Sequence, residues 1–195
     1  MVEAAVDARL TPVQRRRRQR IMESALELAA EGGYEAVQMR TVAARADVAL
    51  GTLYRYFTSK EHLLVSAMAE QVAGLRRRLA EKPPRGEDAA DRVMDVLRRS
   101  TRALQRQPNV TSAMLRSLIS SGGEVAGTME PIGEEMTAIV VGAIGPVADE
   151  GHRGVVAEVI QHVWLSALLW WVAGLAPASE IDEKLDRTVA LLLRR

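Results

Sequence analysis

Residues 33–67 read GYEAVQMRTVAARADVALGTLYRYFTSKEHLLVSA and contain two short helical patterns, at about residues 40–46 and 49–57. The connection between the two patterns is too short for anything except a tight, angled turn. This spacing is typical of a helix-turn-helix motif. Leu53 and Phe57 are the large apolar residues that a small three-helix domain needs in its interior, so we expect them to be core residues.

Several side chains of this motif are suited to the DNA backbone. Gly51 has no side chain, so the second helix can approach the backbone closely. Lys60 lies just inside a helix that Ser59 is expected to cap, and its charge adds to the positive end of that helix. The hydroxyl donors predicted for phosphate oxygens are Thr52, Tyr54 and Tyr56. For Tyr54 we expect a mixed role, in which the ring packs and the hydroxyl reaches a phosphate.

Base reading is predicted for side chains at the start of the first motif helix and around the second. These residues are Arg40, Thr41, Leu50 and Arg55. Leu50 is suited to a thymine methyl group in the major groove. A solvated surface charge explains Arg55 equally well.

The motif resembles the TetR family of transcriptional regulators. The matching pieces are Val42-Ala43 with Ala46 and Val48, the run Gly51 to Phe57, and Ser59-Lys60-Glu61. Family members commonly carry glycine at the turn and serine at the next helix cap. Here the turn residue is Asp47, which tolerates left-handed angles, and the cap residue is Ala49, whose side chain cannot cap.

The segment before the motif predicts a helix from Thr11 to Gly32-Gly33. Thr11 and Gln14 form a capping box, and Pro12 suits the first helical position. The run Arg15, Arg16, Arg17 and Arg18 is the dense charge cluster of the chain. Positive charge opposes the dipole at a helix N-terminus, so we expect contact with the DNA backbone or minor groove. The alternative is a solvated helix end.

The rest of the chain also has helical periodicity, so the predicted fold is all-α. Ser59 begins a long helix that ends at Pro83-Pro84. Further helices are expected at about residues 89–106, 111–120, 129–144, 154–175 and 179–193, the last capped by Ser179 with Asp182. We predict an N-terminal arm and helix-turn-helix domain over residues 1–58 and a helical effector-binding and dimerisation domain over 59–195.

Composition excludes several functional classes. The 195 residues have a net charge of +1, so DNA affinity has to come from a local cluster of charge. The chain has no cysteine and no apolar segment near its start, so we expect a cytoplasmic protein without disulfides. The apolar stretch 163–178 is shorter than the roughly 20 residues that span a bilayer. The histidines lack metal-ligand spacing and no nucleophile or phosphate-loop motif occurs, so we expect neither enzyme activity, nor a metal, nor a cofactor.

Apolar residues of the middle and later helices are predicted to line an effector site. Methionine adapts to bulky guests, and the break at residues 120–123 is a possible entrance. The predicted residues are Met94, Leu97, Leu104, Met114, Leu118, Met129, Met136, Trp164 and Leu168. The alternative is that most of them are ordinary core.

The helix at 154–175 is apolar nearly all round, so it has to be covered on two sides. A partner subunit related by a two-fold axis is the simplest cover. The predicted dimer residues are Trp170, Trp171, Ile181, Leu185, Val189 and Leu192. A C-terminal four-helix bundle of this kind is what the TetR resemblance implies.

Residues 34–40, 62–67 and 163–166 are similar to the actinobacterial TetR-type repressors of sterol and cholesterol catabolism. This resemblance implies a repressor of lipid or sterol catabolism genes that a steroid-derived coenzyme A thioester releases. The expected partner is an inverted-repeat operator in double-stranded DNA, bound by a homodimer in successive major grooves. The alternative is a dimeric DNA-binding regulator with no small-molecule effector, or with an unrelated apolar one.

Overall fold

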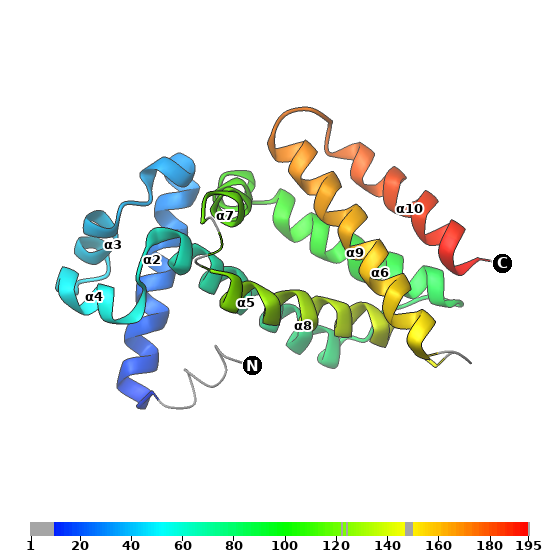
Figure 1. Cartoon of the computed structure of the whole chain (residues 1–195), viewed down its shortest axis with the longest axis horizontal. Coiled ribbons are helices and arrows are strands. Elements are labelled where there is room, and N and C mark those ends of the chain that lie inside the picture. Colours follow the sequence, from blue (N-terminus) through cyan, green and yellow to red (C-terminus); the bar gives the residue numbers. More distant parts are fainter. Residues whose placement is uncertain (1–9, 122, 124, 147–149, 195) are drawn as a thin grey trace. The chain divides into compact units, whose positions relative to one another are not determined.

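The computed structural model describes residues 10–121, 123, 125–146 and 150–194, and their regular secondary structure is entirely helical (Figure 1). The all-α prediction is therefore confirmed. The helices are α2 (Pro12–Ala36), α3 (Met39–Arg45), α4 (Leu50–Tyr56), α5 (Lys60–Glu81), α6 (Ala89–Gln105), α7 (Pro108–Ser120), α8 (Ala126–Ile144), α9 (Glu150–Val172) and α10 (Ser179–Leu193).

Helix α2 begins as the sequence predicts. The Thr11 side chain accepts a hydrogen bond from the Gln14 amide, and the Gln14 side chain accepts one from the Thr11 amide at 2.8 Å. The helix is interrupted at Gly32 and Gly33, where Gly33 has a φ of 67°. Only glycine combines this φ with the observed ψ of −157° without steric cost, so the glycine pair sets the angle at which the chain leaves α2.

The α3–α4 turn contains Asp47, which has a φ of 51° and is the non-glycine residue with positive φ among the described residues. Asp47 thus adopts the left-handed conformation expected at the family's glycine position. Ala49 precedes α4 with extended angles and makes no side-chain capping bond. Two departures from the family pattern are therefore accommodated within the helix-turn-helix geometry.

The chain divides into two compact units, each described by itself. The first contains the residues up to Gln71 together with Gln107–Ile132, and the second contains Val72–Arg106 and the residues from Gly133 onward. Helices α5 and α8 each contribute to both units. The predicted domain boundary at residues 58 and 59 stays a prediction.

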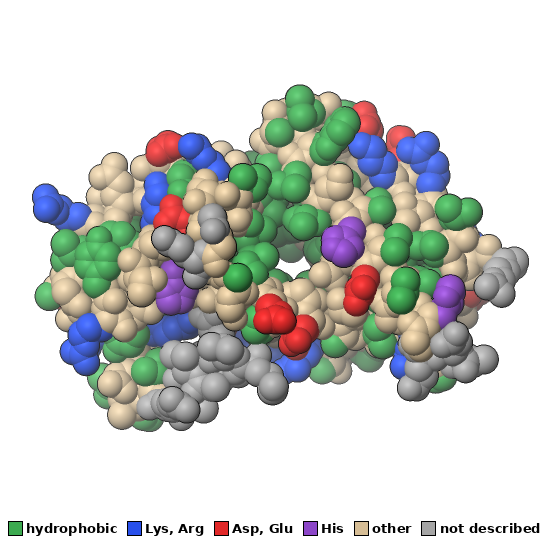
Figure 2. All heavy atoms as spheres, viewed as in Figure 1, with side chains coloured by type: hydrophobic (Ala, Val, Ile, Leu, Met, Phe, Trp, Pro, Cys, Tyr) green, Lys and Arg blue, Asp and Glu red, His purple; other side chains and the backbone are tan. Residues whose placement is uncertain are grey.

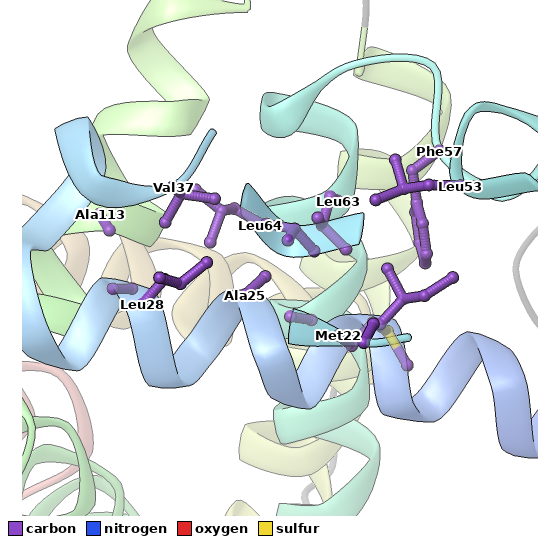
Figure 3. Packing of buried hydrophobic residues seen from close by; sticks show 14 of the residues in the cluster. Met22, Ala25, Leu28, Val37, Leu53, Phe57, Leu63, Leu64 and Ala113 are labelled. Carbon is purple, nitrogen blue, oxygen red and sulfur yellow. The ribbon is translucent and has the colours of Figure 1, made fainter. Parts of the chain in front are cut away.

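The core of the first unit joins α2, α3, α4, α5 and α7. Figure 3 shows Met22, Ala25 and Leu28 of α2 facing Leu63 and Leu64 of α5. Phe57 and Leu53 complete one end of this cluster, and both are fully buried. Burying one leucine or phenylalanine side chain contributes about 1.5–3 kcal/mol to the stability of the fold. The shared core therefore holds α5 and α7 against the helix-turn-helix.

The second unit packs α6, α9 and α10 together, and Figure 1 shows α10 lying alongside α9. The Trp164 indole of α9 donates to the Thr101 hydroxyl of α6 at 2.9 Å, and both residues are buried. Arg98 of α6 forms a two-oxygen contact with Asp186 of α10 at 2.9 and 2.8 Å.

Helices α7, α8 and α9 begin earlier than predicted, and α10 lacks its predicted cap; α7 begins at Pro108 rather than near Thr111. Helix α10 begins at Ser179 itself, the preceding residue is Ala178, and no side chain caps the helix, so the predicted Ser179 cap is wrong. Helix α8 begins at Ala126 and includes Pro131 near its start, where a missing amide is tolerated. Helix α9 begins at Glu150 rather than near Gly154.

One described helix, Gly151–Val172, is long and apolar enough to cross a membrane. Core helices of water-soluble proteins pass the same test, so this property is weak evidence. The helix packs against α10 within the second unit.

Candidate nucleic-acid interface

Helix α4 divides its residues between the core and the surface. Leu53 and the following Phe57 are fully buried, which confirms their predicted core role. Gly51 and Arg55 are exposed, and the Tyr54 side chain is 48% exposed. Helix α4 thus presents the small Gly51, the Tyr54 phenol and the Arg55 guanidinium to solvent, an arrangement that suits close approach to the DNA backbone.

Thr52, Tyr56 and Leu50 are partly buried. Tyr56 and Leu50 both pack against the first unit's core. The apolar body of Tyr56 is therefore used for packing, while its hydroxyl stays a predicted phosphate donor. Leu50 has less free surface for a thymine methyl group than an exposed leucine would have.

The start of α3 is more accessible. Arg40 and Thr41, both predicted base readers, are exposed, whereas the next two residues, Val42 and Ala43, are buried. The first turn of α3 therefore keeps its polar side chains in solvent, while the middle of the helix packs against the core.

The arginine run is not uniform. Arg15 and Arg16 are exposed and Arg17 is partly exposed, but Arg18 is only 4% exposed. The Arg18 guanidinium lies 5.1 Å from the centre of the Phe57 ring. We therefore correct the prediction for Arg18, because a cation buried on an aromatic ring cannot also extend to DNA, and keep it for the other three.

The N-terminus of α5 forms a second cationic position beside the motif. The Ser59 hydroxyl accepts a hydrogen bond from the His62 amide at 3.1 Å, so the predicted cap is present. The Lys60 ammonium lies 3.7 Å from the centre of the Tyr34 ring. Lys60 is partly buried, and its charge lies at the positive end of a 22-residue helix.

Tyr34 and Glu61 are hydrogen-bonded beside Lys60. The Tyr34 hydroxyl donates to the Glu61 carboxylate. Burial, followed by this bond, raises the pKa of Tyr34. Burial alone would raise the pKa of Glu61, but hydrogen bonds from Tyr34, the backbone and Ser59, with the charge of Lys60, hold the pKa below its ordinary value. Glu61 is therefore ionised at neutral pH.

Comparison with known proteins identifies this arrangement. A family model described as bacterial regulatory proteins, tetR family, matches residues 21–67. A model described as tetracyclin repressor-like, C-terminal domain, matches residues 86–192, more than half of the chain.

The chain belongs to the TetR family.

Its relatives in this family include the HTH-type transcriptional repressor KstR of Rhodococcus jostii, which is 43% identical over 92% of this chain and 84% of the relative. KstR of Mycobacterium tuberculosis is 39% identical over 92% of this chain and 82% of the relative. The subgroup resemblance expected from residues 34–40, 62–67 and 163–166 is confirmed.

Solved TetR-type structures agree. A TetR transcriptional regulator from Rhodococcus sp. RHA1 has a TM-score of 0.84 and 31% identity, covering 93% of this chain and 98% of that one. The fold is also shared by Thermus thermophilus FadR in complex with lauroyl-CoA, with a TM-score of 0.70 and 20% identity over 90% of this chain and 92% of that one.

The predicted effector residues of this TetR-family chain are distributed over both units. Met114, Leu118 and Met129 belong to the first unit, and Met114 is part of its core. The remaining six belong to the second unit, where all are buried except the partly buried Leu104. Their role in effector binding stays a prediction.

A surface hollow of about 460 Å³ lies in the second unit, but its lining is polar. The lining residues are Arg85, Gly86, Glu87, Asp91, Asp95, Arg98 and Arg102. Sequence reasoning did not find this hollow, because it depends on how the linker before α6 folds back. No cluster of three metal-ligating side chains occurs among the residues described.

The predicted dimer residues fall into two groups. Trp170 is 50% exposed, and Trp171 and Leu192 are partly exposed. The other three are Ile181, Leu185 and Val189, which form the predicted apolar stripe of α10. Each is 1% exposed or less, so the stripe packs inside the protomer. The prediction that these three residues contact a second subunit is therefore wrong.

The exposed apolar surface of this region lies elsewhere. On α9 it includes Val155, Val159 and Trp170 at helical spacing, and on α10 it includes Leu191, which is 82% exposed. Figure 2 shows hydrophobic side chains on the surface near the α9–α10 connection. Residues of this kind are the ones that a partner would cover.

Proposed function

We propose that this chain represses transcription by binding an inverted-repeat operator as a homodimer in the cytoplasm. The observation that carries the proposal is the exposure of Arg40, Thr41, Tyr54 and Arg55 on a well-packed helix-turn-helix. Similarity to the repressor KstR over 92% of the chain supports the same conclusion.

The proposed contacts divide into positioning and reading. Lys60 and the hydroxyls of Thr52, Tyr54 and Tyr56 bind phosphates and fix the register of the protein on the duplex. Arg40, Thr41 and Arg55 then read base edges in the major groove. Two such motifs in one dimer fit successive major grooves, about 34–36 Å apart.

The second element of the proposal is release by an apolar coenzyme A thioester derived from a steroid. Its support is the resemblance to sterol-catabolism repressors and the use of the same fold by a regulator bound to lauroyl-CoA. Residues 59–195 would then form the effector-binding and dimerisation domain, with the buried apolar side chains of α6 and α9 as the lining.

One observation favours a regulator without an effector. Met94, Leu97 and Leu168 are 3% exposed or less, so they already have apolar neighbours in the chain. A ligand that binds the folded state raises the melting temperature by mass action, whereas a protein without an effector responds to no thioester. A response to a different apolar ligand would leave the repressor proposal intact and change its effector.

The experiment measures binding to a fluorescent duplex that the protein selects from a random library. The titrants are cholanoyl-CoA, stearoyl-CoA and free coenzyme A, with anisotropy and melting temperature as the two measurements. We expect cholanoyl-CoA to release the duplex at lower concentration than stearoyl-CoA, and free coenzyme A to have no effect. Failure to select any duplex would refute the DNA-binding function, and indifference to all three titrants would refute the steroid thioester.

A further inference from the structure

Tyr34 is surrounded by charged side chains from two other helices. The Lys60 ammonium of α5 lies 3.7 Å from the centre of its ring, and the Arg116 guanidinium of α7 lies 4.6 Å from the same point. Both distances are within the roughly 6 Å at which a cation is attracted to an aromatic face. One ring thus contacts a cation from each helix.

The Tyr34 hydroxyl contacts α5 as well. It donates to Glu61 in the first turn of that helix. Tyr34 follows directly after the break at Gly33, where the chain leaves the regular part of α2. Its position is therefore determined by these contacts rather than by a continuing helix.

Helix α7 is otherwise packed on the helix-turn-helix unit. Asn109 donates to the Ala30 carbonyl of α2 at 3.0 Å, and Arg116 pairs with Glu35 at 2.8 Å. Val110 and Ala113 are part of the first unit's core. A displacement of the end of α7 would consequently be transmitted to the Tyr34 side chain.

We propose that Tyr34 is a positioning residue through which α7 sets the location of the Lys60 ammonium at the N-terminus of α5. Arg116 holds the ring from the α7 side, and the ring holds Lys60. This inference deepens the proposed function and rests on it, because Lys60 is a predicted phosphate contact. It makes Arg116 of α7 part of the support for Lys60, so that changing Arg116 changes DNA affinity without α3 or α4 being altered.

The first test is a double-mutant cycle of Arg116→Met and Lys60→Met, with affinity for the selected duplex as the measured quantity. We expect Arg116→Met to weaken binding about two- to fivefold, the range that a cation–aromatic contact supports. In the Lys60→Met background, and in a Tyr34→Leu background, the same change should cause no further weakening. Equal weakening in all backgrounds would overturn the proposal, since Arg116 would then act independently of the ring and of Lys60.

Glu35→Gln is the matched control. It removes the Arg116–Glu35 ion pair and leaves the contact between Arg116 and the Tyr34 ring in place. We expect DNA affinity within experimental error of the unaltered protein. Weakening as large as that of Arg116→Met would assign the effect to the ion pair and overturn the role of the ring.

A second measurement needs no DNA and separates this inference from the proposed function. Hydrogen exchange of the free protein reports the His62 and Leu63 amides, which bond to the Ser59 hydroxyl at 3.1 Å and the Ser59 carbonyl at 3.1 Å. We expect faster exchange there in Arg116→Met, and unchanged exchange in Glu35→Gln. Unchanged exchange in Arg116→Met would overturn the link between α7 and α5 even in a protein that binds DNA.

Discussion

Substituting Ala49 by serine should stabilise the protein, because α4 begins without a side-chain cap. Ala49 has φ and ψ of −62° and 141°, which are the extended angles of an N-cap residue. Its carbonyl already accepts bonds from the Thr52 and Leu53 amides at 2.8 and 3.1 Å. A serine hydroxyl at this position can accept from the remaining amides of the first turn.

The expected gain follows from the exposure of Ala49 and the short length of α4. Ala49 is exposed, so serine displaces no core side chain. A serine in place of an alanine N-cap contributes typically about 1 kcal/mol, within a range of roughly 0.5–2 kcal/mol. For a chain of this size, about 1 kcal/mol corresponds to a rise of roughly 2–4 °C in melting temperature.

The assay is thermal and urea unfolding of Ala49→Ser beside Ala44→Ser. Ala44 is also exposed but lies inside α3, where serine cannot cap and costs about 0.5 kcal/mol in helix propensity. The reasoning predicts opposite signs for the two variants. Equal melting temperatures, or a loss in Ala49→Ser, would refute the assignment of residue 49 as an uncapped N-cap.

Three further predictions concern the core, the pH dependence and the arm. Phe57→Ala should lower the free energy of unfolding by about 3–5 kcal/mol, because a fully buried ring is removed; urea unfolding checks this, and a loss near zero would contradict the core assignment. The pKa of Glu61 is lowered from 4.5, so ionised Glu61 stabilises the folded protein at pH values above 4.5, and this stabilisation is lost as the pH falls through the lowered pKa. Glu61→Gln should therefore lose less stability than the unaltered protein between pH 7 and pH 3. Replacing Arg15–Arg17 by glutamine should flatten the salt dependence of DNA binding. An unchanged dependence of affinity on salt concentration would indicate that these residues form a solvated helix end.

Local features of the fold could be predicted because neighbouring residues determine them. The Thr11 capping box and the Ser59 cap each require only residues three positions apart. The left-handed Asp47 agrees with the tolerance of aspartate for such angles in a tight turn. The Ser179 cap failed because Ala178 already has helical angles, with φ and ψ of −58° and −28°, so Ser179 lies inside the helix rather than at its N-cap.

Features that depend on distant contacts were not predictable from periodicity. The stripe of Ile181, Leu185 and Val189 correctly indicated one buried face of α10, but a stripe does not say whether its partner is the same chain or a second copy. Arg18 belonged to a run that looked uniform, and only the fold brings Phe57 beneath it.

The group around Tyr34 was missed for the same reason. Arg116 is 82 positions further along the chain, and no local pattern relates it to Tyr34 or Lys60. The signal available in the sequence was the glycine pair before Tyr34, which indicated a special chain path but not its neighbours.

Nuclease footprinting of the DNA upstream of the gene tests the central assignment most directly. The unaltered protein should protect two half-sites of an inverted repeat whose centres are about one helical turn apart, and Tyr54→Ala with Lys60→Ala should abolish that protection. Absence of a protected repeat, or protection that the double substitution leaves unchanged, would contradict the assignment of α3 and α4 as the DNA-binding element.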